Sequence, residues 1–109
     1  MPLKKVSNVD WAYIAGFVDG EGCIYCNIVN GKKRPMRRMR VAVRQKHRKI
    51  LDWIACTTGI GKVYGPYPPH SDSYLYIVVE KQAKLFLKKT VKYLRVEKDK
   101  AKQALEWLT

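Results

Sequence analysis

Residues 11–22 read WAYIAGFVDGEG, and this stretch begins like a helix and ends in two acidic residues set between glycines. Asn8 or Asp10 is available as the N-cap in front of the apolar run 11–18. One side of the predicted helix is nearly bare, because small residues gather there: Ala12, Ala15, Gly16 and Gly20. Larger side chains normally hold two helix axes about 8–10 Å apart, so the bare side predicts close packing against another helix.

Two carboxylates end this predicted helix. Asp19 and Glu21 stand just before the point where a new element has to start, since residues 23–29 have the composition of a strand. A carboxylate held at the base of a tightly packed helix pair is a candidate metal ligand. Acidic residues beside glycines are also common in solvated turns. The spacing alone leaves both interpretations open.

The composition predicts a single intracellular domain, residues 1–109, that binds a polyanion. A chain of 109 residues is long enough for one hydrophobic core. The net charge of +13 favours nucleic acid as partner, with an anionic membrane surface second. No apolar run reaches the roughly 20 residues of a membrane span, and the first residues lack a signal-peptide pattern. Three cysteines cannot all pair with one another, which indicates a reducing compartment such as the cytoplasm, the nucleoid or an organelle, and not secretion.

The pair Cys23 and Cys26 has the spacing of half a zinc site. On a strand, however, two residues three positions apart point to opposite faces. The chain has no second C-x-x-C motif, and His47 and His70 are its only histidines. A structural zinc ion needs four ligands in a tetrahedron, so the sequence argues against zinc.

Two predicted strands, 23–29 and 36–45, flank a hairpin turn at Asn30-Gly31. One face of this strand pair is apolar and is expected to belong to the core: Ile24, Cys26, Ile28, Met39, Val41 and Val43. The other face is basic, and ten lysines and arginines fall between positions 32 and 49, a region without any acidic residue. Such a face would repel itself without a polyanion. Arginine is also the side chain best shaped to clamp phosphates and to contact guanine edges.

The rest of the chain predicts a helix at 47–58, strands at 60–67 and 73–80, a helix at 81–93 and a last helix from Val96 onward. Alternation in the strand 73–80 is expected to direct three residues inward (Leu75, Ile77 and Val79) and three outward (Tyr74, Tyr76 and Val78). The order αββαββα, with a split final helix, predicts an α+β fold. A four-stranded antiparallel sheet would be covered by helices on one face.

The uncovered face of this sheet is the predicted DNA-binding surface, because cationic and aromatic groups on a β-ribbon suit the major groove. Twelve residues are expected to contact DNA: Tyr25, Asn27, Lys32, Lys33, Arg34, Arg37, Arg38, Arg40, Arg44, Tyr64, Tyr74 and Tyr76.

Residues 14–22, IAGFVDGEG, resemble the signature of the LAGLIDADG homing endonucleases at all nine positions, by identity or close substitution. The resemblance implies a saddle-shaped sheet laid along double-stranded DNA and metal-dependent hydrolysis of phosphodiester bonds. Because the chain has a single motif, it implies a homodimer that recognises a long, nearly palindromic site. The expected dimer contact lies on the motif helix: Ala12, Ala15, Gly16, Asp19 and Gly20.

The resemblance also assigns roles within the site. Glu21 takes the position of the metal-binding acid, usually an aspartate in the family, and the carbonyl of Gly20 assists it; Mg²⁺ is the expected ion, with Mn²⁺ as a substitute. Asp19 is expected to cap the helix or contact the backbone. Gln45 would order the attacking water. Two further roles complete the implied pocket. Arg48 or Lys49 would supply a nearby positive charge, and Lys98 would be the pocket lysine, with Glu97 as the neighbouring alternative for that position.

Two other functional classes stay open from the sequence. One is a DNA- or RNA-binding protein on the same fold that does not cleave, such as an intron maturase or a regulator. The other is a ribosomal-type RNA-binding protein, which the charge alone suggests but which leaves the motif in residues 14–22 unexplained.

Overall fold

The computed structural model describes residues 5–30, 35–66 and 72–107, with side chains at 5–27, 38–66 and 72–106. The elements follow the predicted order: α1 (Asn8–Glu21), β1 (Gly22–Asn30), β2 (Pro35–Gln45), α2 (Arg48–Thr58), β3 (Lys62–Tyr64), β4 (Tyr74–Val79), α3 (Glu80–Thr90), a 3-10 turn (Val91–Tyr93) and α4 (Lys98–Trp107). The αββαββα order and the α+β class are thereby confirmed. β3 is shorter than expected, and the last helix begins at Lys98, after an exposed Val96.

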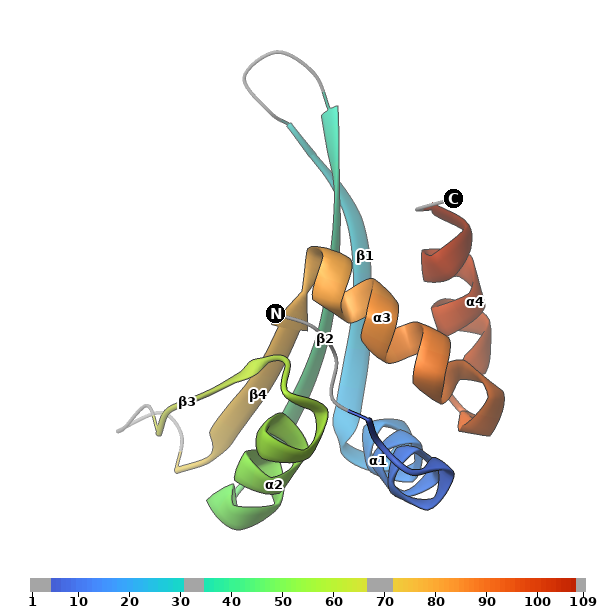
Figure 1. The fold of residues 1–109 in the computed structure, drawn as a ribbon. Helices are drawn as coiled ribbons and strands as arrows, with labels where there is room; N and C mark the ends of the chain where they lie inside the picture. Colours follow the sequence, from blue (N-terminus) through green and yellow to red (C-terminus); the bar gives the residue numbers. More distant parts are fainter. Residues whose placement is uncertain (1–4, 31–34, 67–71, 108–109) are drawn as a thin grey trace.

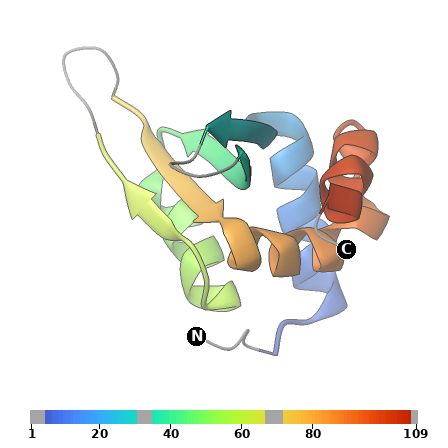
Figure 2. The same ribbon diagram turned by 90° about the horizontal axis from the view of Figure 1, so that it is seen from above.

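The four strands form one antiparallel sheet in the order β1-β2-β4-β3. Figures 1 and 2 show the helices gathered on one side of it. The side chains that the sheet turns toward the helices are buried: Ile24, Met39, Val41, Val43, Tyr76 and Val78. β2 pairs with β4 only from Arg40 onward, so the β1–β2 hairpin continues past the end of β4 as a two-stranded ribbon (Figure 1).

Helix α1 starts earlier than the sequence predicted. Ser7 is its N-cap, and the Ser7 hydroxyl accepts a hydrogen bond from the backbone N–H of Asp10 at 3.1 Å. The expected caps Asn8 and Asp10 are both inside the helix. A serine side chain is short enough to bond a backbone N–H exposed in the first turn, which is the usual way to satisfy it.

The predicted alternation of β4 is wrong by one residue. Tyr76 and Val78 are buried, while Val79 is 45% exposed. The pairing with β2 explains this: residues directly opposite each other share a face, and Tyr76 and Val78 stand opposite the buried Val43 and Val41. The sequence YLYIVV is apolar in both phases, so only the register decides which side chains turn inward. Tyr76 therefore belongs to the core, Tyr74 packs against it, and neither belongs to the uncovered face.

Tyr76 is held at the centre of a small polar cluster within the core. Its hydroxyl donates to the carbonyl of Ile60 at 2.8 Å, and the Thr58 hydroxyl donates to the carbonyl of Ile54 at 2.8 Å. Gly61, with φ of +84°, lies so close to the Tyr76 ring that an added Cβ would stand 2.5 Å from it. Burial raises the pKa of the Tyr76 phenol from 10.0 to about 12.

This raised pKa predicts a loss of stability in alkali. In the unfolded chain the phenol ionises near pH 10, whereas in the folded chain it keeps its proton until about pH 12. The stability tied to the proton is therefore complete below pH 10 and is lost as the pH rises toward 12. Between these pH values the free energy of unfolding should fall by about 2–3 kcal/mol.

Urea unfolding at several pH values checks this prediction. Tyr76→Phe should cost about 1 kcal/mol at pH 8 through the lost hydrogen bond, and its stability should fall less steeply above pH 10. Tyr64→Phe, at a tyrosine that is 42% exposed, is the matched control and should follow the wild type. Equal alkaline slopes for wild type and Tyr76→Phe would contradict the prediction.

Within the described residues, no helix has both the length and the apolar character needed to cross a membrane.

Candidate nucleic-acid interface and active site

The uncovered face of the sheet carries cationic and polar side chains as predicted. Tyr25 pairs with Arg40 and Asn27 with Arg38 across β1 and β2, and all four side chains are exposed. The Arg40 guanidinium carbon lies 4.6 Å above the centroid of the Tyr25 ring. This contact holds the guanidinium over a flat surface and leaves its N–H groups available at the edges.

Arg44 and Tyr64 extend this face toward β3. Both stand opposite Leu75 of β4, one on each side, and both are exposed. Of the other predicted DNA contacts, Lys32, Lys33 and Arg34 lie outside the described residues. Arg37 lies in β2 opposite Ile28, but its side chain is outside the described part.

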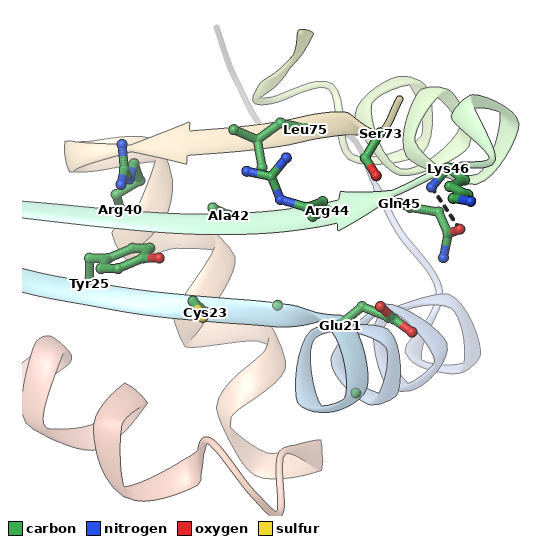
Figure 3. Close-up of a pocket in the computed structure, with 12 residues that line it drawn as sticks. Glu21, Cys23, Tyr25, Arg40, Ala42, Arg44, Gln45, Lys46, Ser73 and Leu75 are labelled. Atoms are coloured by element: carbon green, nitrogen blue, oxygen red, sulfur yellow. Dashed lines mark hydrogen bonds between the residues drawn. The ribbon is translucent and has the colours of Figure 1, made fainter. Parts of the chain in front are cut away.

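A hollow of about 580 Å³ lies at the end of this face where α1 runs into β1. Figure 3 shows Glu21 and Gln45 at the same end of the strands, with Arg44, Arg40 and Tyr25 further along. The hollow is lined by Gly20, Glu21, Gly22, Cys23, Tyr25, Arg40, Ala42, Arg44, Gln45, Lys46, Ser73 and Leu75. The structure thus brings together the predicted metal ligands Gly20 and Glu21, the predicted water-ordering residue Gln45, and three predicted DNA contacts.

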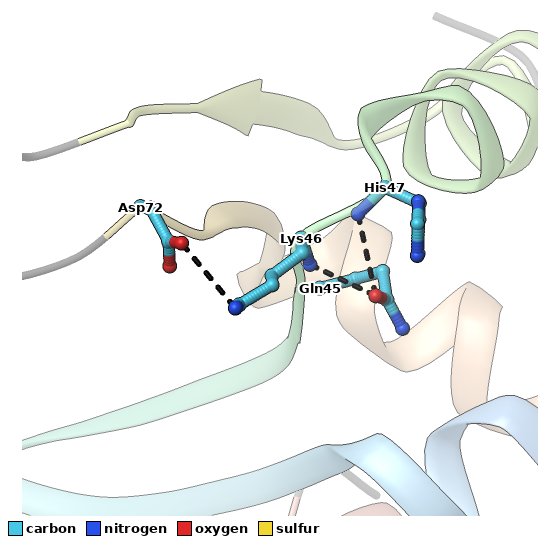
Figure 4. Close-up of polar contacts among 4 residues, drawn as sticks. All are labelled: Gln45, Lys46, His47 and Asp72. Atoms are coloured by element: carbon cyan, nitrogen blue, oxygen red, sulfur yellow. Dashed lines mark hydrogen bonds and ion pairs between the residues drawn. The ribbon is translucent and has the colours of Figure 1, made fainter.

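Gln45 is oriented by the turn that follows β2. Its side-chain oxygen accepts hydrogen bonds from the backbone N–H groups of Lys46 at 2.9 Å and His47 at 3.3 Å (Figure 4). The carbonyl end is therefore occupied by the chain itself. The amide NH₂ is the end left to face a ligand, and it can only donate hydrogen bonds.

The predicted cations do not line the hollow. Arg48 forms an ion pair with Asp52 at 3.3 Å and lies 5.4 Å from the centroid of the Tyr74 ring. Lys98 is half-buried at the start of α4. The lysine that lines the hollow is Lys46, whose ammonium lies 3.4 Å from an Asp72 carboxylate oxygen. In the sequence Lys46 directly follows Gln45, but no local pattern separates it from the nearby Arg48.

The metal-ligand set within one chain is small. Glu21 supplies a carboxylate and Gly20 a carbonyl, both hard oxygen donors of the kind that Mg²⁺ takes. No cluster of three or more His, Cys, Asp or Glu side chains able to hold a metal occurs in the described part of the chain. Cys23 and Cys26 lie on opposite faces of β1, as the alternation predicted, the first exposed and the second half-buried. These donors fit a divalent cation in kind.

Asp19 binds the backbone of a distant segment. Its two carboxylate oxygens accept hydrogen bonds from the N–H of Arg95 at 2.7 Å and of Glu97 at 3.0 Å. These bonds join the end of α1 to the segment that leads into α4. The predicted backbone contact of Asp19 is present. The carboxylate binds backbone groups of its own chain, so Asp19 does not belong to a bare side of the helix.

The bare side of α1 is narrower than predicted and is rotated. Ala15 is fully buried in the core beside Trp11 and Val18, so it cannot belong to an open contact surface. The exposed stripe of α1, named here the glycine stripe, consists of Val9, Tyr13, Gly16 and Gly20. Among the residues that the structure describes, an added Cβ at Gly16 or Gly20 would meet nothing within 4 Å. Ala12 is half-buried at the margin.

Comparison with known proteins finds one family model and several solved structures that this chain resembles. The family model described as LAGLIDADG endonuclease matches residues 14–108. The homing endonuclease I-CvuI, in crystal structures with the I-CreI target in Mg and with its own target in Ca, is 28% identical with a TM-score of 0.79. These matches cover 90% and 91% of this chain, and 64% and 65% of the other. The archaeal intron-encoded I-Vdi141I, complexed with DNA, has the same fold (23% identity, TM-score 0.74, covering 91% of this chain and 66% of that one). This chain thus spans somewhat less than two thirds of I-CvuI. No curated protein matches it.

Proposed function

Because the chain belongs to the LAGLIDADG endonuclease family, we propose that it is a homing endonuclease that hydrolyses phosphodiester bonds of a long, nearly palindromic double-stranded DNA site with a divalent metal ion. One observation carries the proposal. Glu21, the acid of the motif, lines the same hollow as Gln45 and the arginines of the uncovered sheet face. A phosphodiester held by this face would therefore lie beside the motif carboxylate.

DNA binding is attributed to the uncovered face. Arg38, Arg40 and Arg44 alternate along β2 on this face, where Tyr25 and Tyr64 add aromatic surface. Arginine contributes both phosphate neutralisation and hydrogen bonds to guanine edges. Binding of this kind weakens steeply with salt, because each neutralised phosphate releases counterions.

The reaction requires negatively charged ligands for the metal ion, a positioned water molecule, and a positive group that balances the charge of the phosphate. Glu21 and the carbonyl of Gly20 would hold Mg²⁺ or Mn²⁺. A bound divalent ion supplies the positive charge that lowers the pKa of water and stabilises the leaving oxygen. The Gln45 amide would donate to the attacking water or to a phosphate oxygen. Lys46 would balance charge on the phosphate, and Lys98 or Arg48 would do so only after a change of its position.

A homodimer is proposed because one chain supplies one motif carboxylate, whereas cleavage of two strands needs one at each scissile phosphate. The glycine stripe is the proposed contact. An apolar hollow of about 350 Å³, lined by Val9, Asp10, Tyr13, Ile50 and Trp53, adjoins it. The glycine stripe of α1 also carries the apolar side chains of Val9 and Tyr13, and a helix that is apolar on all sides is normally buried all round. In the protomer, α1 buries only the side that carries Trp11, Ile14 and Val18.

A selection on a randomised duplex library in Mg²⁺ or Mn²⁺ tests the proposal as a whole. Cleaved products should share one long site with approximate two-fold symmetry, which reports activity, specificity and assembly together. An enriched site in the bound fraction without cleavage would indicate a DNA-binding protein that does not cut. The absence of both enriched binding and cleavage would reject the proposal.

A further inference from the structure

Glu80 occupies an unusual place, at the point where β4 ends and α3 turns away from the sheet. Arg40 opposite Val79 is the last β2–β4 pair, so in the described part of the chain the next backbone N–H of β2 on that side has no strand partner. The Glu80 carboxylate accepts a hydrogen bond from this group: the backbone N–H of Met39 donates to Glu80 Oε1 at 3.3 Å. Glu80 thereby supports the root of the β1–β2 ribbon.

The second carboxylate oxygen of Glu80 faces an arginine of the uncovered face. Arg38 Nη1 lies 4.0 Å from Glu80 Oε2, and both side chains are about half exposed. Together with Tyr25, Asn27 and Arg40, they line a hollow of about 270 Å³ on this face. It is a different hollow from the one lined by Glu21, and among the described residues the two linings share only Tyr25 and Arg40.

Glu80 supports the ribbon and the first turn of α3, but these contacts are partly offset by its own backbone conformation. Glu80 has a φ of +56°, the left-handed region that is unfavourable for any residue other than glycine. Exposed ion pairs of this length contribute little to folding. A carboxylate among arginines also repels DNA phosphates, so it lowers affinity for every sequence alike. A group that weakens general binding is useful to a binding protein where it discriminates between sequences.

We propose that Arg38 and Glu80 form a specificity-determining pair that reads one G·C base pair in each half-site, an inference that rests on the proposed function above. In the major groove a guanine presents two acceptors, N7 and O6, and its cytosine presents the N4 amino donor. Arg38 supplies donors for the guanine edge, and Glu80 supplies the acceptor for the cytosine. An A·T pair in the same orientation replaces the O6 acceptor with the N6 amino donor and the N4 donor with the O4 acceptor. The guanidinium then loses one acceptor, and the carboxylate faces an oxygen that cannot donate to it.

The alternative for the same residues is that Arg38 contacts a phosphate and Glu80 only supports the ribbon. The two cases differ in what they predict. A phosphate contact changes affinity for all sequences equally, whereas a base contact changes the preference at one position of the site.

The test is a binding selection on a randomised duplex library in Ca²⁺, scored by sequence preference at each position. Glu80→Gln keeps an oxygen that can accept from the Met39 N–H but removes the charge. Its preference for G·C should fall by about tenfold at one position per half-site, while its affinity for unselected DNA rises. Arg38→Lys should reduce the preference at the same position. Glu106→Gln on α4 removes the same charge away from the sheet face and should leave every preference unchanged.

The outcomes separate the inference from the function that it builds on. If the wild type selects a site and Glu80→Gln selects it with equal preferences, Arg38 and Glu80 do not read a base pair. A uniform change of affinity in Arg38→Lys would likewise reject the pair. If the wild type selects no sequence at all, the proposed site-specific function fails, and this inference fails with it.

Discussion

Glu21→Gln is expected to lower the rate of DNA cleavage by a factor of about 10³ or more, while duplex binding is retained. Charge stabilisation by a metal ion is worth several kcal/mol, and about 4 kcal/mol corresponds to this factor in rate. The substitution keeps the size of the side chain and an oxygen, but a neutral amide is a poor ligand for a hard cation. Glu21 is exposed and is the last residue of α1. A carboxylate at the negative end of a helix is unfavourable for folding, so its removal should not destabilise the protein.

A plasmid carrying the selected site provides the assay, with nicked and linear products followed over time in Mg²⁺. Glu21→Asp should retain cleavage, since it preserves the charge. Glu106→Gln should cleave like the wild type. Cleavage by Glu21→Gln at the wild-type rate would remove Glu21 from the reaction. If wild type and Glu21→Gln are equally inert on a duplex that both bind, the protein is a DNA-binding protein without nuclease activity.

In the proposed homodimer, Gly16→Leu is expected to abolish the proposed double-strand cleavage by separating the two subunits, while it makes each subunit more stable. In the described part of one subunit a Cβ at Gly16 has no neighbour within 4 Å, so the new side chain meets no other group there. Leucine also favours the helix over glycine by about 0.8–1 kcal/mol. In a dimer whose α1 helices meet at glycines, by contrast, the leucine would hold the backbones apart. Inserting a leucine overpacks this contact, which costs about 1–3 kcal/mol at each of the two symmetric positions. Association of the subunits should therefore weaken by about 100-fold or more.

Sedimentation at several concentrations measures the association, and thermal unfolding measures the stability of the variant. The two expected changes have opposite signs: association of the subunits weakens, while the stability of each subunit rises. A damaged fold would instead lower both the association and the stability. Gln103→Leu, on the exposed side of α4, is the control and should leave the dimer and the cleavage unchanged. A wild type that sediments as a monomer when bound to its duplex, or a Gly16→Leu variant that remains a dimer, would reject the glycine stripe as the contact.

Much of the fold followed from local patterns. The order of the elements, the inward face of β1 and the arginine face of β2 were predicted, because apolar and charged residues alternate there without ambiguity. β4 was predicted in the wrong phase, because tyrosine, leucine, isoleucine and valine fill both of its faces. Its orientation depends on which residues of β2 stand opposite, and that pairing is made between segments distant in the sequence.

The candidate site divides in the same way. The motif in residues 14–22 identified Glu21 and Gly20, and the end of the arginine strand identified Gln45, because each has a recognisable neighbourhood in the chain. Lys46 was missed although it follows Gln45, since nothing local distinguishes it from Arg48. Ala15 was assigned to the open side because it is small, whereas the angle of 100° per residue turns it toward Trp11 and Val18.

The amino-acid sequence by itself determined the helix with its two glycines, the basic strand and the acid between glycines, since periodicity, charge and small side chains act within a few residues of one another. Only the tertiary structure decided what those residues meet. The Met39 N–H and the Glu80 carboxylate are 41 positions apart, and Asp19 binds backbone groups 76 and 78 positions away. Such contacts exist only once the sheet has paired and the helices have packed, because hydrogen bonds and ion pairs act over a few ångströms in space, whatever the separation along the chain.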